Sequence, residues 1–427
     1  MTDEHEYLPN ENTPVEYFPI KDPSSENSSN EGPIPPAPPV AQRPGFQPPS
    51  PPAPSTATKS GPSAQRLESL DVLRGFDMFW IIGGCSFLLA VANYIGNPAI
   101  IETVKWHTKH VGWEGFAAID LVFPLFVFIT GATMPFSIRA KIERGEPKWR
   151  LYRRLARRTI LLLLLGLLGK LLSLDFANLR PLSVLGLIGM AYLIAGLVVI
   201  NRGPRGQAAW AVGILMGYWA ALMFIPVPGI GAGMFTPGGC LCGYIDYNLL
   251  PGKLYQGVFD PEGILTWIPA AAMALIGAQA GNLLRANPAS QRGYRNFFTL
   301  AASGIVLLAI GWGWGQWFPI IKAIWSTTFV LFAAGWSLLL LSICYLFIDV
   351  WRERWLGFVF IPIGMNAITI YVAGGFVDFG YTAERIFGGL EQAASENLAP
   401  VIATLGVVVV KWMLLFFLYR KKIFIRV

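Results

Sequence analysis

Long apolar runs recur along this chain and constrain its fold more than any other feature. The runs Thr159–Leu172 and Ser326–Phe347 approach the roughly twenty residues that an α-helix needs to cross about 30 Å of hydrocarbon. Of 427 residues, 54% are hydrophobic and only 14% are charged, which leaves too little charge for the surface of a soluble protein. The alternating segments of about ten residues that are typical of outer-membrane barrels do not occur. The sequence therefore predicts an all-α, polytopic membrane protein.

The apolar runs after Arg66 divide into about ten expected transmembrane helices. Basic residues crowd the even-numbered connections, most densely between Arg139 and Arg158, while the odd-numbered connections carry fewer of them. By the positive-inside rule, both termini are expected on the cytoplasmic side of the cell (inner, cytoplasmic) membrane. The expected spans are residues 72–94, 116–138, 155–175, 181–200, 207–227, 263–284, 297–318, 324–348, 356–376 and 397–419.

The first part of the chain has a different composition. Residues 1–65 are rich in proline and small polar residues, and a segment of this kind cannot bury a core. It has no charged stretch followed by an apolar one, so it is not a signal peptide. We expect a disordered cytoplasmic tail at 1–65 and a transmembrane domain at 66–427.

The four cysteines do not form a disulfide framework, and we expect no metal site. Cys240 and Cys242 are separated by a single residue, and no histidine lies near them in sequence. We interpret these thiols as structural.

Titratable groups lie at the edge of the second expected span, in "KWHTKHVGWEGFAAIDLVFPLFVFITG". Imidazole titrates near neutrality, so His110 is a candidate base that takes a proton from an attacking amine or hydroxyl. His107 and Lys109 are alternative bases. Asp120 lies about one turn into the span, where it either orients the imidazole or stabilises its cation, or pairs with Arg74. Pro124 is expected to kink or loosen this helix.

Other polar groups are rare in the apolar segments, and such groups are functional candidates because their burial in the bilayer is costly. Asp71 and Arg74 are three residues apart and share a helix face, so they can pair, and the pair either pins a helix end or has a functional role. Asn366 either binds a ligand or joins helices. A further candidate functional segment is the connection 229–262, which is expected to be external. Because it is unusually long, we expect it to form a compact structured lid.

Nine basic residues lie between 139 and 158, more than orientation requires. They either bind anionic lipid or hold a polyanionic cytosolic ligand, because guanidinium groups match phosphates. The candidates for such a ligand site include Arg153, Arg154 and Arg158. The basic segment, His110 and the polar groups of the apolar segments together suit either group transfer across the membrane or a transport path.

Several segments resemble the heparan-α-glucosaminide N-acetyltransferase family over nearly all of residues 66–427. These segments are "RLESLDVLRGFDMFW", "KHVGWEGFAAIDLVFPLFVFITG", "GYIDYNLLPG", "FDPEGIL", "IPIGMNAITIYV" and "LYRKKIFIRV". The resemblance implies a multi-span enzyme that uses cytosolic acetyl-CoA to acetylate an amine on the far side, and it places His110 on the catalytic histidine. Cys85 stands where human-type enzymes carry an asparagine implicated in catalysis.

We expect the site residues as follows from the motifs and the resemblance together. His110 and Asp120 are expected to be catalytic. The residues expected to bind acetyl-CoA are Arg74, Arg153, Arg154, Arg158 and Asn366. The residues expected to bind the acceptor are Trp113, Asp246 and Glu262.

The leading hypothesis is an acetyltransferase that acts across the membrane on an amino sugar or glycan, by N- or O-acetylation. The alternatives are a permease or flippase for a small polar or anionic solute, and a scaffold that displays the proline-rich tail. Besides the lipid bilayer and the acceptor we expect no nucleic-acid partner, and a homodimer is left open.

Overall fold

The computed structural model describes residues 67–172, 180–255, 257–353 and 355–424. The expected tail at residues 1–65, and with it the expected domain boundary, lies outside the described residues. In the described part the chain is helical, and its β-structure consists of two isolated bridges, Glu114↔Ile321 and Val227↔Gly231.

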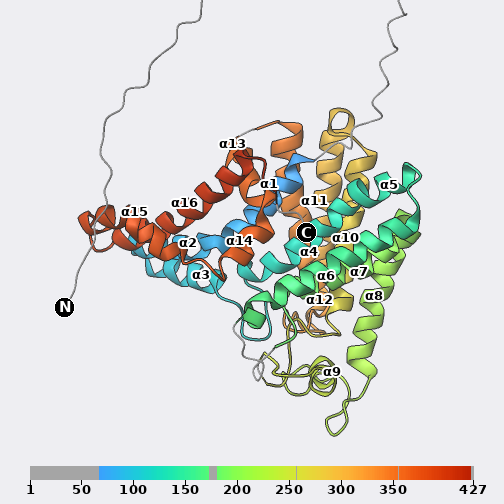
Figure 1. The fold of residues 1–427 in the computed structure, drawn as a ribbon. Helices are drawn as coiled ribbons and strands as arrows, with labels where there is room; N and C mark the ends of the chain where they lie inside the picture. Colours follow the sequence, from blue (N-terminus) through green and yellow to red (C-terminus); the bar gives the residue numbers. More distant parts are fainter. Residues whose placement is uncertain (1–66, 173–179, 256, 354, 425–427) are drawn as a thin grey trace, which may run out of the picture. The chain divides into compact units, whose positions relative to one another are not determined.

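The helices of the described part follow one another along the chain (Figure 1). In chain order they are α1 (Glu68–Phe79), η1 (Trp80–Gly84), α2 (Cys85–Ile95), α3 (Pro98–Thr108), η2 (Ala118–Leu121), α4 (Val122–Met134), η3 (Pro135–Arg139), α5 (Ala140–Glu143), α6 (Lys148–Leu172), α7 (Val184–Asn201), α8 (Pro204–Phe224), α9 (Leu241–Leu249), α10 (Trp267–Ala286), α11 (Ala289–Trp314), α12 (Thr327–Tyr345), η5 (Leu346–Val350), α13 (Trp355–Met365), α14 (Ala367–Ala373), α15 (Phe379–Ala393) and α16 (Ala399–Arg420).

The expected all-α membrane fold is confirmed. Within the described residues, 8 helices are long and apolar enough to cross a membrane, or up to 9 if the bent pair α13 and α14 forms one span. The remaining expected span, residues 155–175, coincides with α6. Its last part, residues 173–175, lies outside the described residues. Every stretch of 18 residues in α6 holds more than two charged side chains, which sets it apart from the others.

Helices α4 and α10 pack at the centre of the bundle, where most of their side chains are buried. Small residues allow their backbones to approach closely, as is usual for helices in membranes. A Cβ atom at Gly131 would lie 1.8 Å from the carbonyl oxygen of Ala274, and one at Gly277 would lie 2.1 Å from that of Phe128. This tight pairing fixes the position of α4, whose two ends carry the polar sites described below.

The first span is broken in its middle. Gly83 adopts a φ of 140°, outside the helical range, and interrupts the backbone between α1 and α2. Lys411 of α16 donates a hydrogen bond from Nζ to the carbonyl oxygen of Ile82, at 2.8 Å. The lysine thus satisfies a backbone acceptor next to the break, and Cys85 follows as the first residue of α2.

The expected kink at Pro124 does not occur there. Pro124 lies in the first turn of α4, which begins at Val122. Proline is tolerated in that turn because the first N–H groups of a helix have no partner within it. The irregularity instead precedes the helix, in the short 3₁₀ turn η2.

Three further helices lie in connections for which the sequence predicted no helix. Helix α3 packs against α2, and α15 packs against α16, which in turn contacts α2 (Figure 1). Helix α9 lies in the segment 229–262, the lid, which packs around a small core that includes Cys240, Cys242 and Phe318. The lid is therefore ordered in its described part, as its length and composition predicted.

Candidate active site

The loop that carries His110 is fastened to the connection between α11 and α12. The backbone N–H of Gly115 donates to the carbonyl oxygen of Ile320 at 2.9 Å, next to the bridge between Glu114 and Ile321. Gly115 has a φ of 118°, which favours glycine at this position. The attachment brings two segments distant in sequence to the same end of the bundle.

His110 and Asp120 form a hydrogen-bonded pair at this end. Nδ1 of His110 lies 2.8 Å from Oδ1 of Asp120; the carboxylate is 1% exposed and the imidazole side chain 61% exposed. The second carboxylate oxygen, Oδ2, accepts the backbone N–H of Ala117 at 3.0 Å and that of Val111 at 3.4 Å. Asp120 therefore orients the ring through Nδ1, and the ring's other nitrogen, Nε2, is not needed for this bond.

Lys322 is the third member of this group, and the sequence did not predict it. Its Nζ lies 3.0 Å from Oδ1 of Asp120 and 2.9 Å from Nδ1 of His110. Burial lowers the pKa of Lys322, and the neighbouring Asp120 acts in the opposite direction. In sequence Lys322 is only a basic residue in a short connection, 202 positions from Asp120, so no local pattern could have identified it.

The expected pairing of Asp71 with Arg74 is confirmed, at 3.7 Å. Asp120 was expected either to orient His110 or to pair with Arg74. Its carboxylate bonds to His110 and Lys322, which favours the first of these roles.

His107 occupies a different position. Its Nδ1 accepts the backbone N–H of Ala118 at 3.3 Å, at the start of η2. This bond gives His107 a place in the local backbone structure and separates it from the pair of His110 and Asp120.

A second charged cluster lies next to this group. Arg180 donates to both carboxylate oxygens of Asp260, at 2.6 and 2.5 Å, and also bonds to Glu262. The guanidinium lies 4.9 Å from the ring centroid of Tyr255. Burial raises the pKa of Glu262, and Arg180 opposes this shift. The charge of Glu262 acts on Lys322, so the two clusters are electrostatically coupled.

Trp113 and Asp246 hold the lid in place. Nε1 of Trp113 donates to the carbonyl oxygen of Phe235 at 2.5 Å, and its ring packs edge-on against Phe259. Asp246 is fully buried, and its Oδ1 accepts the backbone N–H of Ile264 at 3.0 Å. Both residues were expected to bind the acceptor; the structure gives each a contact that joins the lid to its surroundings.

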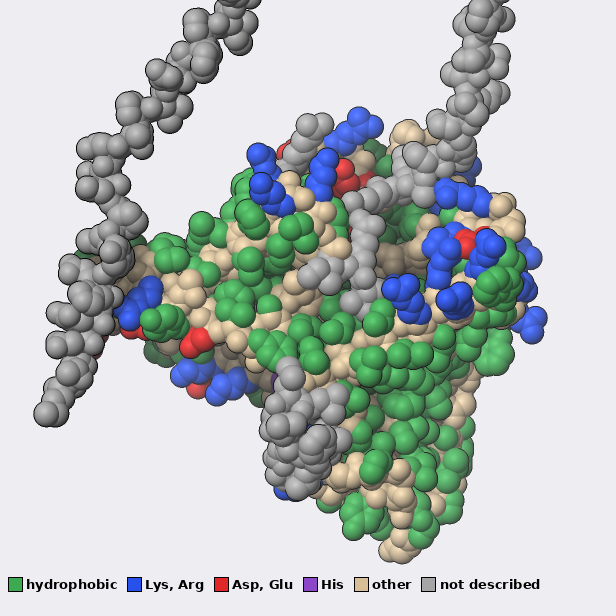
Figure 2. All heavy atoms as spheres, viewed as in Figure 1, with side chains coloured by type: hydrophobic (Ala, Val, Ile, Leu, Met, Phe, Trp, Pro, Cys, Tyr) green, Lys and Arg blue, Asp and Glu red, His purple; other side chains and the backbone are tan. Residues whose placement is uncertain are grey.

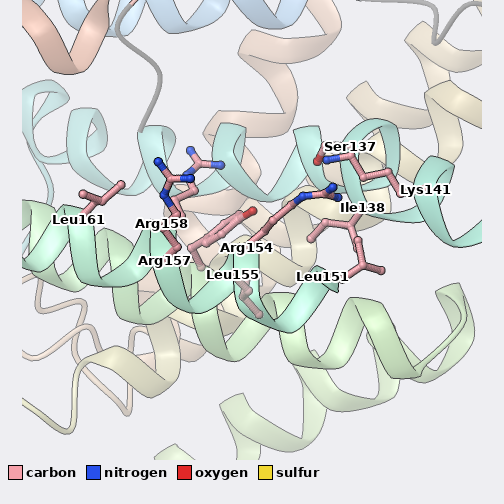
Figure 3. A pocket seen from close by; sticks show the side chains of 10 residues that line it. Ser137, Ile138, Lys141, Leu151, Arg154, Leu155, Arg157, Arg158 and Leu161 are labelled. Carbon is pink, nitrogen blue, oxygen red and sulfur yellow. The ribbon is translucent and has the colours of Figure 1, made fainter. Parts of the chain in front are cut away.

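Basic side chains gather around α5 and the beginning of α6, at the other end of α4 (Figure 2). A cavity of about 300 Å³ opens there between η3, α5, α6 and α7 (Figure 3). It is lined by Ser137, Ile138, Lys141, Leu151, Arg154, Leu155, Arg157, Arg158, Leu161 and Tyr192.

Arg158 is the most distinctive cation of this cavity. Its guanidinium carbon lies 4.3 Å from the ring centroid of Tyr192. Its Nε is buried without a hydrogen-bond partner among the described residues. Arg154, in contrast, is already bonded to Glu146, at 2.6 and 2.8 Å. Arg158 is thus the lining arginine with a buried donor left for an anionic ligand.

The structure brings together only part of the residue set expected to bind acetyl-CoA. Arg154 and Arg158 line the cavity, together with Arg157, Lys141 and Tyr192. Arg153 is exposed on α6 and is not part of this lining. Arg74 contacts Asp71, and Asn366 donates to the carbonyl oxygen of Ile423 at 3.2 Å, at the break between α13 and α14.

Comparisons with known proteins support the resemblance of the motifs. A family model described as a domain of unknown function (DUF5009) matches residues 66–173. The chain is 30% identical to heparan-alpha-glucosaminide N-acetyltransferase from Homo sapiens over 415 residues, which cover 84% of this chain and 59% of that protein. It is 28% identical to the enzyme of that name from Mus musculus over 422 residues, which cover 85% of this chain and 60% of that protein. The chain thus spans about three fifths of the length of these relatives.

The substitution Asp246→Asn tests the role of this residue in the lid. Burial raises the pKa of Asp246 to about 6, above the value of about 3.9 in an unfolded chain. The folded state therefore binds a proton more tightly, and the stability of the parent falls as pH rises from about 4 to about 6. The amide removes this charge, so the melting temperature of Asp246→Asn should exceed that of the parent at pH 7.5. The difference should shrink towards pH 5.

Thermal unfolding of the detergent-purified protein at several pH values measures this difference. An unchanged melting temperature at every pH, together with loss of acceptor binding, would contradict the role in the lid and favour direct contact with the acceptor.

Proposed function

We propose that the chain, as a member of the heparan-alpha-glucosaminide N-acetyltransferase family, transfers acetyl groups across a membrane. The donor is cytosolic acetyl-CoA, and the acceptor is an amino sugar or other glycan on the opposite side. The name of the relatives supports N-acetylation of a glucosamine-type amine. Two polar sites of the chain support this proposal.

The observation that carries this proposal is that α4 joins these two sites. Asp120 precedes α4, and Ser137, which lines the basic cavity, follows it. The intervening residues rise about 25 Å at roughly 1.5 Å per residue, close to the hydrocarbon thickness of about 30 Å. The buried packing of α4 against α10 keeps this separation fixed.

The basic cavity suits the phosphate groups of CoA. Guanidinium groups form paired hydrogen bonds with phosphate oxygens, and the buried Nε of Arg158 is an available donor. Arg157 and Lys141 add positive charge, and Tyr192 supports the plane of Arg158. A cavity of about 300 Å³ accommodates part of the cofactor, so the rest of the molecule extends towards the bundle.

His110 is proposed to act as the general base at the other end. A protonated amine cannot attack a thioester, so the base must hold the acceptor's proton during the attack. Asp120 orients the imidazole through Nδ1, which directs Nε2 to the acceptor. The exposed side chain of His110 leaves this nitrogen accessible from the aqueous side. Transfer proceeds either directly or through an acetyl-histidine, and ping-pong kinetics would favour the second route.

The charge distribution supports the orientation. Basic residues concentrate near α5 and the start of α6, so this end is proposed to face the cytosol of the cell membrane. The lid and His110 then face outward, and both termini are cytoplasmic.

The orientation can be tested by cysteine labelling. In intact cells, a cysteine at Lys253 of the lid should react with a membrane-impermeant thiol reagent, and one at Arg292 of α11 should not. The four native cysteines are buried or half-buried, and the parent protein serves as the control for their reactivity. The reverse pattern would place His110 on the cytosolic side and refute transfer in the proposed direction.

The substitution His110→Ala tests the base. Turnover of acetyl-CoA with a panel of amino sugars should fall by about 10²–10⁴-fold, the usual contribution of general acid–base catalysis. Binding of CoA and the melting temperature should stay near those of the parent, because His110 is mostly exposed. His107→Ala is the matched control and should have a much smaller effect on turnover. Activity of His110→Ala within a few-fold of the parent would exclude the proposed mechanism.

The substitution Arg158→Gln tests the donor site. We expect CoA, measured by calorimetry in detergent, to bind at least about tenfold more weakly, because hydrogen bonds to charged groups contribute about 1.5–3 kcal/mol each. Arg153→Gln is the matched control, five residues before Arg158 on α6 and outside the cavity lining. Equal affinities of both variants and the parent would mean that the basic cluster serves orientation and lipid binding, and would favour a permease.

A further inference from the structure

His110, Asp120 and Lys322 form a closed triangle of hydrogen-bond distances. Nδ1 of His110 lies 2.8 Å from Oδ1 of Asp120 and 2.9 Å from Nζ of Lys322, and Nζ lies 3.0 Å from the same Oδ1. Nδ1 is a donor when protonated and an acceptor when not. It therefore cannot donate to Asp120 and accept from Lys322 at the same time.

The charge of Lys322 selects between these two arrangements. An ammonium group has only donors, so it favours an unprotonated Nδ1, and the ring proton then lies on Nε2. A neutral amine has a lone pair and tolerates a protonated Nδ1, which leaves Nε2 free to act as a base. In both arrangements Nζ can donate to Asp120.

We propose that Lys322 is a positioning residue that acts through His110: it sets which ring nitrogen carries the proton and receives the proton that His110 removes from the acceptor. This inference rests on the proposed acetyl transfer. It goes beyond that proposal because it adds a residue that neither the sequence motifs nor the orienting role of Asp120 required.

The two arrangements are the states before and after one proton transfer. Before it, Lys322 is neutral, Nδ1 of His110 is protonated and Nε2 is free. When Nε2 takes a proton from the acceptor, Nδ1 gives its own proton to Nζ. The result is an ammonium group paired with the carboxylate of Asp120 and a neutral imidazole protonated on Nε2. The positive charge therefore lies on Lys322 instead of on the ring.

The overall balance of acetyl transfer is kept. Starting from the neutral amine, the acceptor nitrogen forms a bond to the acetyl carbon and loses one proton to Nε2, and the carbon–sulfur bond breaks with its electron pair remaining on sulfur. The proton held by Lys322 returns through His110 to the departing thiolate. No further reactant is needed, because the proton lost by the amine is the one that the thiol gains.

The surroundings of Lys322 are suited to a change of charge. Burial lowers its pKa, whereas the negative charges of Asp120 and Glu262 raise it. Glu262 is itself bonded to Arg180, which also engages Asp260. The other charged groups of the bridged loop, Lys109 and Glu114, are both exposed. The side chain of Lys322 is 25% exposed, so the aqueous phase can also exchange its proton.

The backbone holds Lys322 in a well-defined turn. The N–H of Trp325 donates to the carbonyl oxygen of Lys322 at 2.9 Å. Oγ of Ser326 accepts the N–H of Ile321 at 3.0 Å and donates to the carbonyl oxygen of Pro319 at 2.9 Å. A turn fixed at both ends positions Nζ against His110 before a substrate binds, which favours proton transfer.

Two variants separate this role from a purely structural ion pair. Lys322→Arg keeps a cation beside Asp120, but a guanidinium is not deprotonated in proteins. We expect it to preserve the melting temperature and CoA binding while kcat falls by about 10²-fold, within the usual range of acid–base effects. In the parent, we expect kcat to rise with pH as Lys322 loses its proton. Lys322→Met should lower kcat and abolish this rise. Full activity of Lys322→Arg would overturn the proposal.

Nitrogen-15 NMR of histidine-labelled protein provides a test without substrate. The chain has three histidines, and the signals of His110 are assigned by their loss in His110→Asn. In the parent, the ring proton should move from Nε2 to Nδ1 as pH rises through the pKa of Lys322. In Lys322→Met, it should remain on Nδ1, donated to Asp120.

The outcomes distinguish the two proposals. If the parent transfers acetyl but its tautomer is unchanged with pH, the role of Lys322 is wrong and the proposed function stands. If the tautomer changes as expected but no amino sugar is acetylated, the proposed function is wrong and the coupling of Lys322 to His110 is upheld. Acetylation of Lys322 itself in the presence of acetyl-CoA alone, detected by mass spectrometry, would make it an acceptor and overturn the relay.

Discussion

The buried carboxylate of Asp120 is the interaction on which the arrangement of the site depends. One of its oxygens fixes the backbone of the loop at Ala117 and Val111, and the other holds both His110 and Lys322. Burying an ionised carboxylate away from water costs several kcal/mol of lost hydration. This cost is offset here by backbone donors and by two side chains from different segments. One buried residue thus holds the loop backbone and two side chains, and the exposed His110 is held in place from its buried side.

The packing of the bundle sets the distance between the basic cavity and His110. Close contact at Gly131 and Gly277 fixes α4 against α10, so the basic cavity and the histidine cannot shift independently. The first span, in contrast, is interrupted at Gly83, where Lys411 satisfies a carbonyl oxygen inside the apolar region. Interrupted helices are tolerated in membranes only where the freed backbone groups find such partners. The bundle therefore combines a rigid central pair of helices with a first span that is broken but hydrogen-bonded.

The expected site residues fall into two groups for a physical reason. His110 and Asp120 are ten residues apart in a loop leading into a helix, and local geometry brings them together. Trp113 and Asp246 were expected to bind the acceptor from the motifs and the resemblance, and in the structure each has a contact that joins the lid to its surroundings. Polar residues in a compact loop must satisfy buried backbone groups as well as bind ligands, and sequence does not separate these tasks. Along α6, likewise, Arg158 faces the cavity and Arg153 does not, although both belong to one basic run.

The sequence by itself determined the helical membrane fold, the approximate spans and the pairing of Asp71 with Arg74, because hydropathy and helical periodicity are local properties of the chain. It also indicated the resemblance to the family, since the motif around His110 is contiguous. Only the tertiary structure revealed Lys322 beside Asp120, Tyr192 beneath Arg158 and Lys411 at the broken first span. Each of these contacts joins segments far apart in the sequence and depends on how whole helices pack. No pattern within a single segment encodes which distant side chain will meet it.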